Sequence, residues 1–382
     1  VSAMGKSTNM LESILTNKWT KSPYQNSLSK FENYHREICL NLFTHQEHPV
    51  FDRLEQLFQA LHQSLKQSEP GSHDKEYDQV VSFGELISTT LVHAYLEHTG
   101  TSYQLLDARE IIITDSTYGE GKIRWDLTKK AIESKLNQIT TTPYLTQGFI
   151  AADEHGNTIT LGREGSDFTA AIIAHCLEAE SVTIWKDVPG VLNADPERWD
   201  KTVKYQALSY GEAAEMTYYG ASVIHPKTIR PLAVKGIPMF VRSFKDPHLE
   251  GTKITEIQHD ALEPAIIFKK NQCLISFQVR DFSFINESKI SMIFHLFEEF
   301  NIRVNMMQSS ASSFTVCVDN PDSKMKNIIN SLSAEFDILY NDQLELITIK
   351  NYQLDLVESV IGDRQVMLEQ RTRRNFQALV SK

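Results

Sequence analysis

Apolar residues along this chain follow helical and strand spacing in turn. Between residues 28 and 67 they recur every three or four positions, which is typical of amphipathic helices. Short apolar runs bounded by turn residues predict strands, and these fall at 103–106, 110–114, 144–151 and 181–185. Further helices are predicted at 86–98, 127–138 and 168–180, and residues 71–78 are predicted to be a polar loop. The alternation predicts an α/β sheet covered on both faces, with ligands at the carboxyl ends of its strands.

A second pattern begins near residue 260, after a strand predicted at 238–244. Strands are predicted at 265–279, 303–308, 312–319, 343–350, 364–371 and 373–380. Helices are predicted at 285–300, 321–335 and 353–361. This βαββαβ order, which starts again near residue 343, is typical of ferredoxin-like α+β domains. We therefore expect one domain over residues 1–260 and a second region over residues 261–382.

Length and charge narrow the classes of function. A chain of 382 residues can build two or three domains, because single cores rarely grow beyond about 250–300 residues. The net charge of -11 and the lack of Lys/Arg runs argue against a nucleic-acid or anionic-membrane partner. No apolar run approaches the roughly 20 residues of a membrane span. An anionic substrate would therefore need a local positive pocket.

The cysteines and histidines suggest neither a disulfide framework nor a metal site. The four cysteines are far apart and form no C-x-x-C pair, so we expect buried thiols in a reducing, cytoplasmic compartment. They are Cys39, Cys176, Cys273 and Cys317. The 13 histidines show no metal-ligand spacing. We expect no metal held directly by the protein.

Residues 161–171 carry the strongest chemical signal. Arg163, two glycines, Ser166 and Asp167 precede an apparent helix, where unpaired N–H groups and a partial positive charge favour an anion. Ser166 or Asp167 would cap the helix. An ordinary capped helix after a turn is the alternative.

The start of the chain has a related pattern. Val1-Ser2-Ala3 is typical of a strand end that enters a Gly turn before a helix from Met10. We therefore expect a strand and a helix to precede residue 1. Gly5-Lys6-Ser7-Thr8 also matches the end of a phosphate-binding P-loop, but no strand ending in Asp follows at a suitable place. A turn that contacts substrate is the favoured interpretation.

Five segments together resemble aspartate kinases. Their order and spacing match that family throughout, although each motif alone is weak. They are Val1-Ser2-Ala3-Met4-Gly5-Lys6-Ser7-Thr8-Asn9, Phe83-Gly84-Glu85-Leu86-Ile87-Ser88, Leu161-Gly162-Arg163-Glu164-Gly165-Ser166-Asp167, Trp185-Lys186-Asp187-Val188-Pro189-Gly190 and Gly220-Ala221-Ser222-Val223-Ile224-His225-Pro226.

The resemblance implies a fold and an activity. The fold is the amino-acid kinase fold, a three-layer αβα sandwich, followed by ferredoxin-like ACT domains. The reaction is transfer of the γ-phosphate of ATP, with Mg²⁺ held mainly through the phosphates, to the side-chain carboxylate of L-aspartate. Its product is 4-phospho-L-aspartate, in the first step of lysine, threonine and methionine biosynthesis.

The resemblance also implies residue roles. Arg163 would clamp the α-carboxylate of aspartate and Glu85 its α-ammonium, while Ser2, Thr8 and Ser166 would line the same pocket. Asp167 would orient an active-site lysine that the family carries in a Lys-x-Gly-Gly turn, which we expect upstream of residue 1. Without the family resemblance, Glu85 would be interpreted as an acidic residue in the first turn of a helix, where the helix dipole favours it. Arg163 would be interpreted as a surface residue. Glu164, a departure from the commoner Gly, is expected to point outward.

The candidate nucleotide-binding residues differ from the family pattern at more positions than the candidate substrate-binding residues do. Lys186, Asp187, Leu192, Asp195, Ser222 and Lys227 are the candidate nucleotide-binding residues. Leu192 and Glu197 stand where the family often has Tyr and Arg, and Ser222 replaces a frequent Lys. The loss of cations near the polyphosphate is expected to weaken ATP binding unless Lys186 or Lys227 compensates.

The resemblance of residues 261–382 to ACT domains implies that the protein is regulated by an effector and assembles into an oligomer. ACT domains bind amino-acid effectors and dimerise by joining sheets, so an effector and a homodimer are expected. Asn305, Met306 and Ser309 are the candidate effector residues. Because the neutral Asn305 stands where lysine-inhibited relatives have an acid, we expect weak or absent lysine inhibition.

Two alternatives to an aspartate kinase are open. One is another amino-acid kinase, for glutamate or acetylglutamate, although the Glu85/Arg163 pair and the ACT-like region argue against it. The other is a decayed kinase that acts as an effector-binding module. Ser222 and Leu192 motivate this second alternative.

Overall fold

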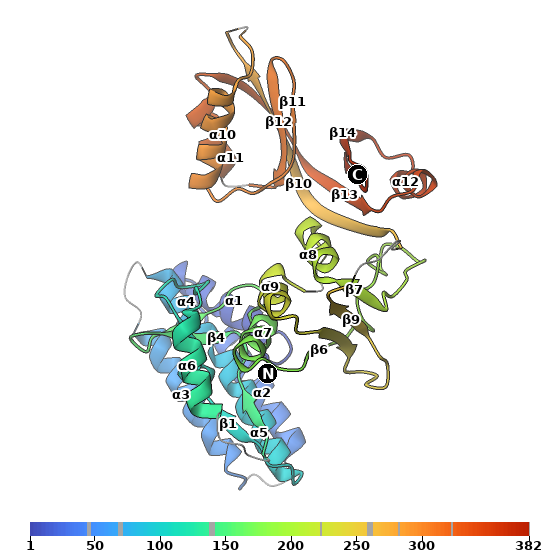
Figure 1. Ribbon diagram of the computed structural model, residues 1–382. Coiled ribbons are helices and arrows are strands. Elements are labelled where there is room, and N and C mark those ends of the chain that lie inside the picture. The colour runs from blue at the N-terminus through green and yellow to red at the C-terminus, as the bar shows by residue number, and fades with distance from the viewer. Residues whose placement is uncertain are drawn as a thin grey trace. The chain divides into compact units, whose positions relative to one another are not determined.

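The structure, a computed structural model, describes residues 1–43, 47–67, 72–136, 142–221, 224–257, 263–281, 283–321 and 324–381. The chain forms two compact units (Figure 1). Unit 1 comprises Val1–Ile184 and Ile224–Phe240, and unit 2 comprises Trp185–Val223 and Val241–Lys382. The domain boundary predicted between residues 260 and 261 lies outside the described residues and stays a prediction.

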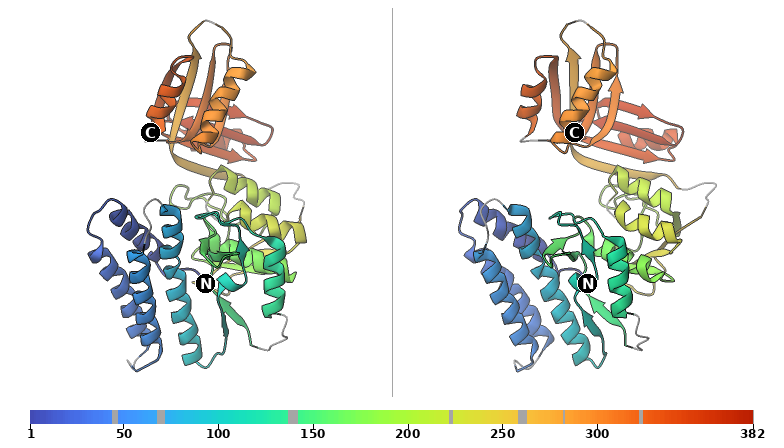
Figure 2. Two further views of the ribbon diagram at one scale, coloured as in Figure 1. Left: turned by 90° about the vertical axis from the view of Figure 1, so that its left-hand side faces the viewer. Right: turned by 60° about the vertical axis from the view of Figure 1, so that its left-hand side comes forward.

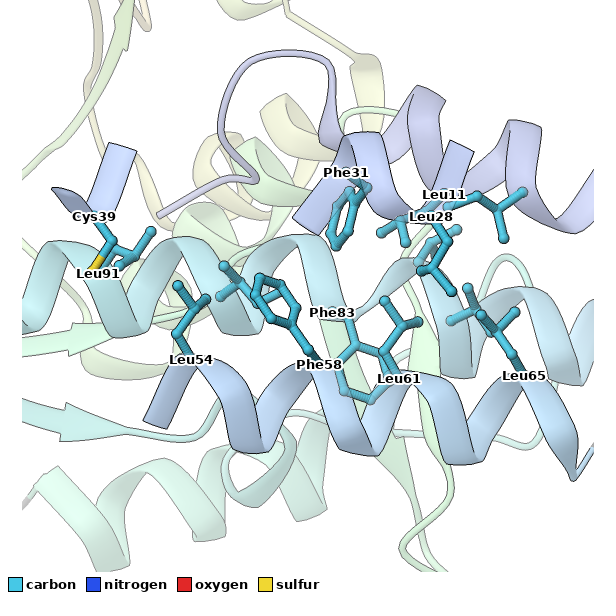
Figure 3. Packing of buried hydrophobic residues seen from close by; sticks show 14 of the residues in the cluster. Leu11, Leu28, Phe31, Cys39, Leu54, Phe58, Leu61, Leu65, Phe83 and Leu91 are labelled. Carbon is cyan, nitrogen blue, oxygen red and sulfur yellow. The ribbon is translucent and has the colours of Figure 1, made fainter. Parts of the chain in front are cut away.

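A layer of packed helices opens unit 1. It contains α1 (Ser7–Trp19), α2 (Gln25–Leu42), α3 (Val50–Lys66), α4 (His73–Val81) and α5 (Phe83–His98). The helical spacing of residues 28–67 places apolar side chains on facing stripes of α2 and α3, and these meet the apolar sides of α1 and α5. Figure 3 shows Leu11, Phe31, Leu54 and Phe58 in the buried cluster that results. Burying such side chains stabilises the layer by about 1.5–3 kcal/mol each relative to exposure.

The polar-loop prediction for residues 71–78 is wrong from His73 onward, where α4 begins. Asp78 is fully buried in this helix. Its carboxylate accepts hydrogen bonds from the N–H of Gly119 and of Thr160, at 2.9 and 3.0 Å from Oδ2. The charge at residue 78 therefore ties the helical layer to β5 (Thr158–Thr160) instead of facing solvent. From the sequence alone, a charged residue such as Asp78 is expected to lie in an exposed loop, because burying a carboxylate is costly unless it has hydrogen-bond partners.

The remainder of unit 1 alternates strands and helices, as predicted. After α5 come β1 (Gln104–Leu106), the 3₁₀ turn η1 (Ala108–Glu110), β2 (Ile113–Thr114), α6 (Trp125–Leu136), β3 (Tyr144–Thr146), β4 (Ile150–Asp153), β5 and α7 (Gly165–Leu177). β1 pairs in parallel with β3, and β2, β4 and β5 form a second sheet in that order. The helix α9 (Pro226–Lys235) completes the unit and packs on α7.

The strand predicted at 144–151 is two strands with a bend between them. Gly148 and Phe149 form the bend, and Phe149 has a positive φ of 67°. The N–H of Phe149 donates to Oγ1 of Thr169, at 3.0 Å, so α7 holds the bend in place. The bend brings the backbone of residue 148 against the start of α7.

A four-stranded sheet has the order β6-β8-β9-β7. Its strands are β6 (Val182–Lys186), β7 (Ala207–Ser209), β8 (Met239–Ser243) and β9 (Thr252–Thr255), and α8 (Tyr210–Tyr219) follows β7 directly. The chain passes from one unit to the other within β6 and again within β8. The predicted strands at 181–185 and 238–244 correspond to β6 and β8.

A six-stranded antiparallel sheet dominates the rest of unit 2 (Figure 2). Its strand order is β11-β12-β10-β13-β15-β14. Its strands are β10 (Ala265–Val279), β11 (Val304–Ser309), β12 (Ser313–Asp319), β13 (Phe336–Lys350), β14 (Val366–Arg371) and β15 (Asn375–Val380). The helices are α10 (Glu287–Glu299), α11 (Met325–Leu332) and α12 (Leu354–Ile361). The predicted order is confirmed, but β13 begins seven residues earlier than residue 343.

The early start of β13 changes how the two ferredoxin-like modules are built. β10 and β13 pair over almost their whole length, with register shifts between Lys269 and Leu274. The later half of β10 and the first half of β13 pack with α10 and α11, around Phe277, Phe297 and Phe336. The opposite halves pack with α12 and β15. The first module is thus inserted into the second, and they share two strands instead of following one another.

None of the helices in the described ranges combines the length and the hydropathy that a membrane crossing requires.

Candidate active site

The turn at the start of the chain lies against the beginning of α5. The N–H of Ala3 donates to Oε1 of Glu85 at 3.2 Å, and Oγ of Ser88 donates to the carbonyl of Ser2 at 2.7 Å. A Cβ atom at Gly84 would lie only 3.0 Å from that of Ala3, so a side chain there would force Ala3 to shift by a few tenths of an ångström. Ser2 and Glu85, two predicted substrate residues, are therefore neighbours.

Glu85 is the most perturbed acid of this region. Its side chain is only 3% exposed, and Oε2 is a buried oxygen with no hydrogen-bond partner among the described residues. Burial raises the pKa of the Glu85 carboxyl to about 7, although the N–H of Ala3 favours its charged form. An unsatisfied buried acceptor costs stability, so its presence favours a ligand that donates to Oε2. A dipole-favoured first-turn acid would face solvent instead.

The bend at Gly148 joins this turn to Ser166. The N–H of Gly148 donates to the carbonyl of Val1 at 2.7 Å. A Cβ atom at Gly148 would lie 2.6 Å from Cβ of Ser166, so a side chain there would collide with the start of α7. These contacts gather Ser2, Glu85 and Ser166 in one region of unit 1. The sequence analysis missed Gly148, although a glycine inside an apparent strand is a recognised sign of close backbone approach.

Helix α7 begins earlier than expected and without the expected cap. Its first residue is Gly165, so Ser166 and Asp167 lie in the first turn instead of at the N-cap. The N-cap residue is Glu164, which has a left-handed φ of 53° and caps no N–H with its side chain among the described residues. The N–H groups of the first turn thus lack a side-chain cap, as an anion site requires. Arg163 is exposed directly before them.

Lys227 lies at this same turn in unit 1. Its Nζ donates to the carbonyl of Leu161 at 2.7 Å and lies 3.8 Å from a carboxylate oxygen of Glu120. Burial lowers the pKa of Lys227, while the charges of Glu120 and Glu164 oppose that shift. The expectation that Glu164 points outward is wrong, because Oε2 of Glu164 is buried.

Thr8 lies at the start of α1 and is partly buried. The Gly turn before it depends on Gly5, which has a φ of 55° and where a Cβ atom would lie 2.4 Å from the Tyr34 hydroxyl. The buried Ser7 holds the other side of the turn through its Oγ, which donates to the carbonyl of Met4 at 2.5 Å.

Unit 2 contains a cavity of about 580 Å³ at the carboxyl end of β6. Four of the predicted nucleotide residues line it, namely Lys186, Asp187, Leu192 and Asp195. The nucleotide loop, residues 186–197, forms one wall. Its Gly190 has a φ of 147°, and a Cβ there would lie 2.6 Å from Oγ1 of Thr252. The opposite walls come from the end of α8, where Gly220 and Ala221 belong to a motif singled out in the sequence, and from Ile266, Ile267 and Phe268 of β10, which the sequence did not indicate.

The departures from the family pattern fall at this cavity. Leu192 and Glu197 both line it, so an apolar and an acidic side chain stand where Tyr and Arg were expected. Ser222 lies outside the described residues, next to the lining residue Ala221. Lys186 is the cationic side chain among the lining residues, beside Asp187, Asp195 and Glu197. The described residues contain no cluster of His, Cys, Asp or Glu that could hold a metal ion alone.

The candidate effector residues do not face one pocket. Met306 is 3% exposed and packs into a core cluster of the sheet, whereas Ser309 is exposed. Asn305 donates to Oε1 of Gln272 at 2.7 Å and to Oδ1 of Asp319 at 3.0 Å. Lys269, which the sequence analysis did not single out, donates to Oδ1 of Asn305 at 3.0 Å and pairs with Asp319 at 2.6 Å. An internal ammonium therefore already occupies this polar cluster.

Comparisons with known proteins agree with this architecture. The model of the amino acid kinase family matches residues 1–243. Lysine-sensitive aspartokinase 3 of Escherichia coli is 33% identical over 70% of this chain and 61% of its own length. A chloroplastic bifunctional aspartokinase/homoserine dehydrogenase 1 of Arabidopsis thaliana is 29% identical over 88% of this chain. This chain spans 38% of that enzyme, and so less than two thirds of either relative.

A solved structure extends the likeness to both units. The structure of E. coli aspartokinase III in complex with aspartate and ADP matches 99% of this chain and 88% of that chain, with a TM-score of 0.83 at 25% identity. The chain belongs to the amino acid kinase family. The predicted fold class, an amino-acid kinase αβα fold followed by ferredoxin-like ACT domains, is confirmed.

Proposed function

We propose that this protein is an aspartate kinase, which transfers the γ-phosphate of ATP to the side-chain carboxylate of L-aspartate. The observation that carries the proposal is the buried, unpartnered Oε2 of Glu85 beside the chain-start turn and Ser166. An α-ammonium group would satisfy this oxygen. Arg163 would clamp the α-carboxylate, and Thr8, Ser2 and Ser166 would line the pocket around the zwitterion.

The reaction needs no general base, because the carboxylate nucleophile is already ionised near neutral pH. One side-chain oxygen of aspartate forms a bond to the γ-phosphorus, and the bond from that phosphorus to the β-phosphate oxygen breaks, which releases ADP. Catalysis then consists of positioning and charge neutralisation. Arg163, Lys227 and the N–H groups at the start of α7 would offset the repulsion between two anions. Asp167 is proposed to orient an active-site lysine.

ATP is proposed to bind in the cavity of unit 2, with Lys186 toward the phosphates. Three carboxylates line the same cavity as that lysine, so the polyphosphate would need a further cation. Mg²⁺ fits this charge balance, because it is usually held through phosphate oxygens and one or two carboxylates. The ion would be held mainly through the phosphates, and Asp187 and Asp195 are the lining carboxylates proposed to assist. Bound Mg²⁺ would neutralise charge on the β- and γ-phosphates.

ADP release with L-aspartate, L-glutamate and N-acetylglutamate tests the substrate class. The full-length protein is expected to release ADP only with L-aspartate. Turnover with glutamate or acetylglutamate instead would identify another amino-acid kinase. Effector binding without turnover on any of the three would favour a decayed kinase.

Lys227 remains a proposed source of positive charge for the nucleotide. Replacing Lys227 by Ala is expected to raise KM for ATP by about tenfold, the effect of one lost charge-assisted contact. Steady-state kinetics with varied ATP measure this effect. If KM for ATP stays unchanged while KM for aspartate rises, Lys227 serves the Arg163 turn instead. Lys235→Ala, on the same helix in an exposed pair with Glu178, is the matched control.

Lysine is expected to inhibit weakly, with half-inhibition at millimolar concentration. An incoming ammonium would have to displace Lys269 from Asn305 and Asp319. Titration of ADP release with L-lysine measures the effect. Lys269→Met frees Asp319 and is expected to increase sensitivity to lysine. Inhibition of the wild type at low micromolar lysine would contradict this account.

The assembly and the compartment are also proposals. We infer a homodimer that joins sheets, since β11 and β14 form the edges of the six-stranded sheet and edge strands present unpaired N–H and C=O groups. The four cysteines are buried and form no disulfide among the described residues, and burial raises the pKa of Cys39 to about 11. Inert thiols of this kind support the proposed reducing cytoplasm.

A further inference from the structure

The proposed nucleotide cavity is not built by the kinase segments alone. β10 supplies one wall through Ile266, Ile267 and Phe268, and the same strand continues to Val279 at the centre of the six-stranded sheet. The end of the nucleotide loop also packs into that sheet, because Ala194 and Trp199 belong to the apolar cluster around Ile266 and Phe376. Loop and sheet therefore share a core.

A partly buried ion pair fixes the loop to the sheet at the same place. Nη1 and Nη2 of Arg198 donate to the two carboxylate oxygens of Glu345 on β13, both at 2.8 Å. The Arg198 guanidinium also lies 4.3 Å from the centre of the Phe268 ring, which lines the cavity. Arg198 thus connects Glu345 to the loop end and to the cavity wall.

The setting makes this pair stronger than an ordinary surface salt bridge. The side chains of Arg198 and Glu345 are 25% and 12% exposed, and Nη1 of Arg364 lies 3.3 Å from the same carboxylate. Burial alone would raise the pKa of Glu345, yet the hydrogen bonds and charges of Arg198 and Arg364 hold it below the usual range. Exposed pairs contribute little, whereas bidentate and partly buried pairs fix geometry.

The same sheet also holds α8, whose end forms the third wall of the cavity. Nζ of Lys350, on β13, pairs with Glu212 at 2.7 Å and with Glu215. Nδ2 of Asn375, on β15, donates to Glu215 at 2.9 Å and to the Tyr219 hydroxyl at 3.0 Å. The nucleotide loop and α8 are thus each joined by polar contacts to β13 or to its neighbour β15.

We propose that Glu345 is a positioning residue for nucleotide binding, which acts through Arg198 on residues 195–197 and on Phe268. This inference rests on the proposed binding of a nucleoside polyphosphate in the unit 2 cavity. Glu345 need not touch the nucleotide. A change in the six-stranded sheet would then alter nucleotide affinity through β13 and β10, without a contact to the amino-acid substrate.

Calorimetric titration of the full-length protein with MgADP, in the absence of any amino acid, tests the inference. Glu345→Gln keeps the size of the side chain and removes its charge, so MgADP affinity is expected to fall by about tenfold. In steady-state assays KM for ATP should rise by a similar factor, whereas kcat and KM for aspartate should stay within about twofold. Arg198→Lys, which keeps charge but loses the bidentate fork, is expected to give a smaller loss in the same parameter.

The matched control is Asp337→Asn. Asp337, which like Glu345 lies on β13, pairs at 2.8 Å with Arg280, which directly follows β10, at the end far from Ile266–Phe268 in the pairing register. This variant should bind MgADP like the wild type. Unchanged MgADP affinity in Glu345→Gln, or in Arg198→Lys if the first variant does not fold, would overturn the inference. An equal loss in Asp337→Asn would also overturn it. Normal MgADP binding without aspartate turnover in the wild type would contradict the proposed function alone.

Discussion

Replacing Arg163 by Ala is expected to raise KM for L-aspartate by about 100-fold or more. A bidentate clamp on the α-carboxylate contains two charge-assisted hydrogen bonds, and each such bond contributes about 1.5–3 kcal/mol. Arg163 is exposed, so its loss should change stability by less than about 0.5 kcal/mol. Steady-state kinetics with varied aspartate, together with thermal unfolding, separate the two effects.

Two further variants sharpen this test. Arg163→Lys keeps the charge but loses the planar fork, so an intermediate KM for aspartate is expected. Arg124→Ala removes an exposed arginine of unit 1 whose nearest acidic oxygen, on Glu154, is 3.8 Å away, and should leave kinetics unchanged. If Arg163→Ala shifts KM for aspartate no more than Arg124→Ala does, the proposed clamp is wrong.

Replacing Glu85 by Gln is expected to lower kcat/KM for aspartate by about 100-fold, because a neutral amide pairs weakly with an ammonium. The same change should stabilise the fold at high pH. Burial holds the pKa of Glu85 near 7, above the unfolded value of 4.5, so ionisation of the native carboxyl costs free energy. That cost is absent below about pH 4.5 and reaches about 3 kcal/mol above about pH 8. Chemical unfolding at both pH values measures it.

The same pKa predicts the pH dependence of the wild type. The carboxylate form of Glu85 is needed to bind an ammonium, and kcat/KM reports the ionisation of the free enzyme. Accordingly, kcat/KM for aspartate should rise from about pH 6 to about pH 8, with an inflection near 7 that Glu85→Gln abolishes. Glu97→Gln, an exposed change near the end of the same helix, should keep the inflection. An inflection that persists in Glu85→Gln would assign the titration to another group.

Most of the fold could be predicted from local patterns in the sequence. The spacing of apolar residues located β10 at its observed bounds, because both of its ends coincide with changes in polarity. The start of β13 was missed because Tyr340–Gln343 are exposed in the middle of the strand and interrupt its alternation. The insertion of one ferredoxin-like module into the other follows from that missed half, which only long-range pairing with β10 defines.

The candidate site, too, could be predicted only in part from the sequence. Residues in short motifs, such as Glu85 and Arg163, could be singled out from sequence and family resemblance. Contacts between distant segments could not, since no local pattern encodes them. Gly148 against Ser166 and Lys269 against Asp319 are examples, and the second adds an ammonium group to the surroundings of the candidate effector residue Asn305.

Trapping the product with hydroxylamine tests the central claim most directly. Hydroxylamine converts an acyl phosphate to a hydroxamate, so the full-length protein with MgATP and L-aspartate should form aspartyl hydroxamate in step with ADP release. Omission of aspartate or its replacement by L-glutamate should abolish hydroxamate formation, and Arg163→Ala should reduce it at low aspartate. ADP release without hydroxamate, or no turnover with L-aspartate, would contradict the assignment.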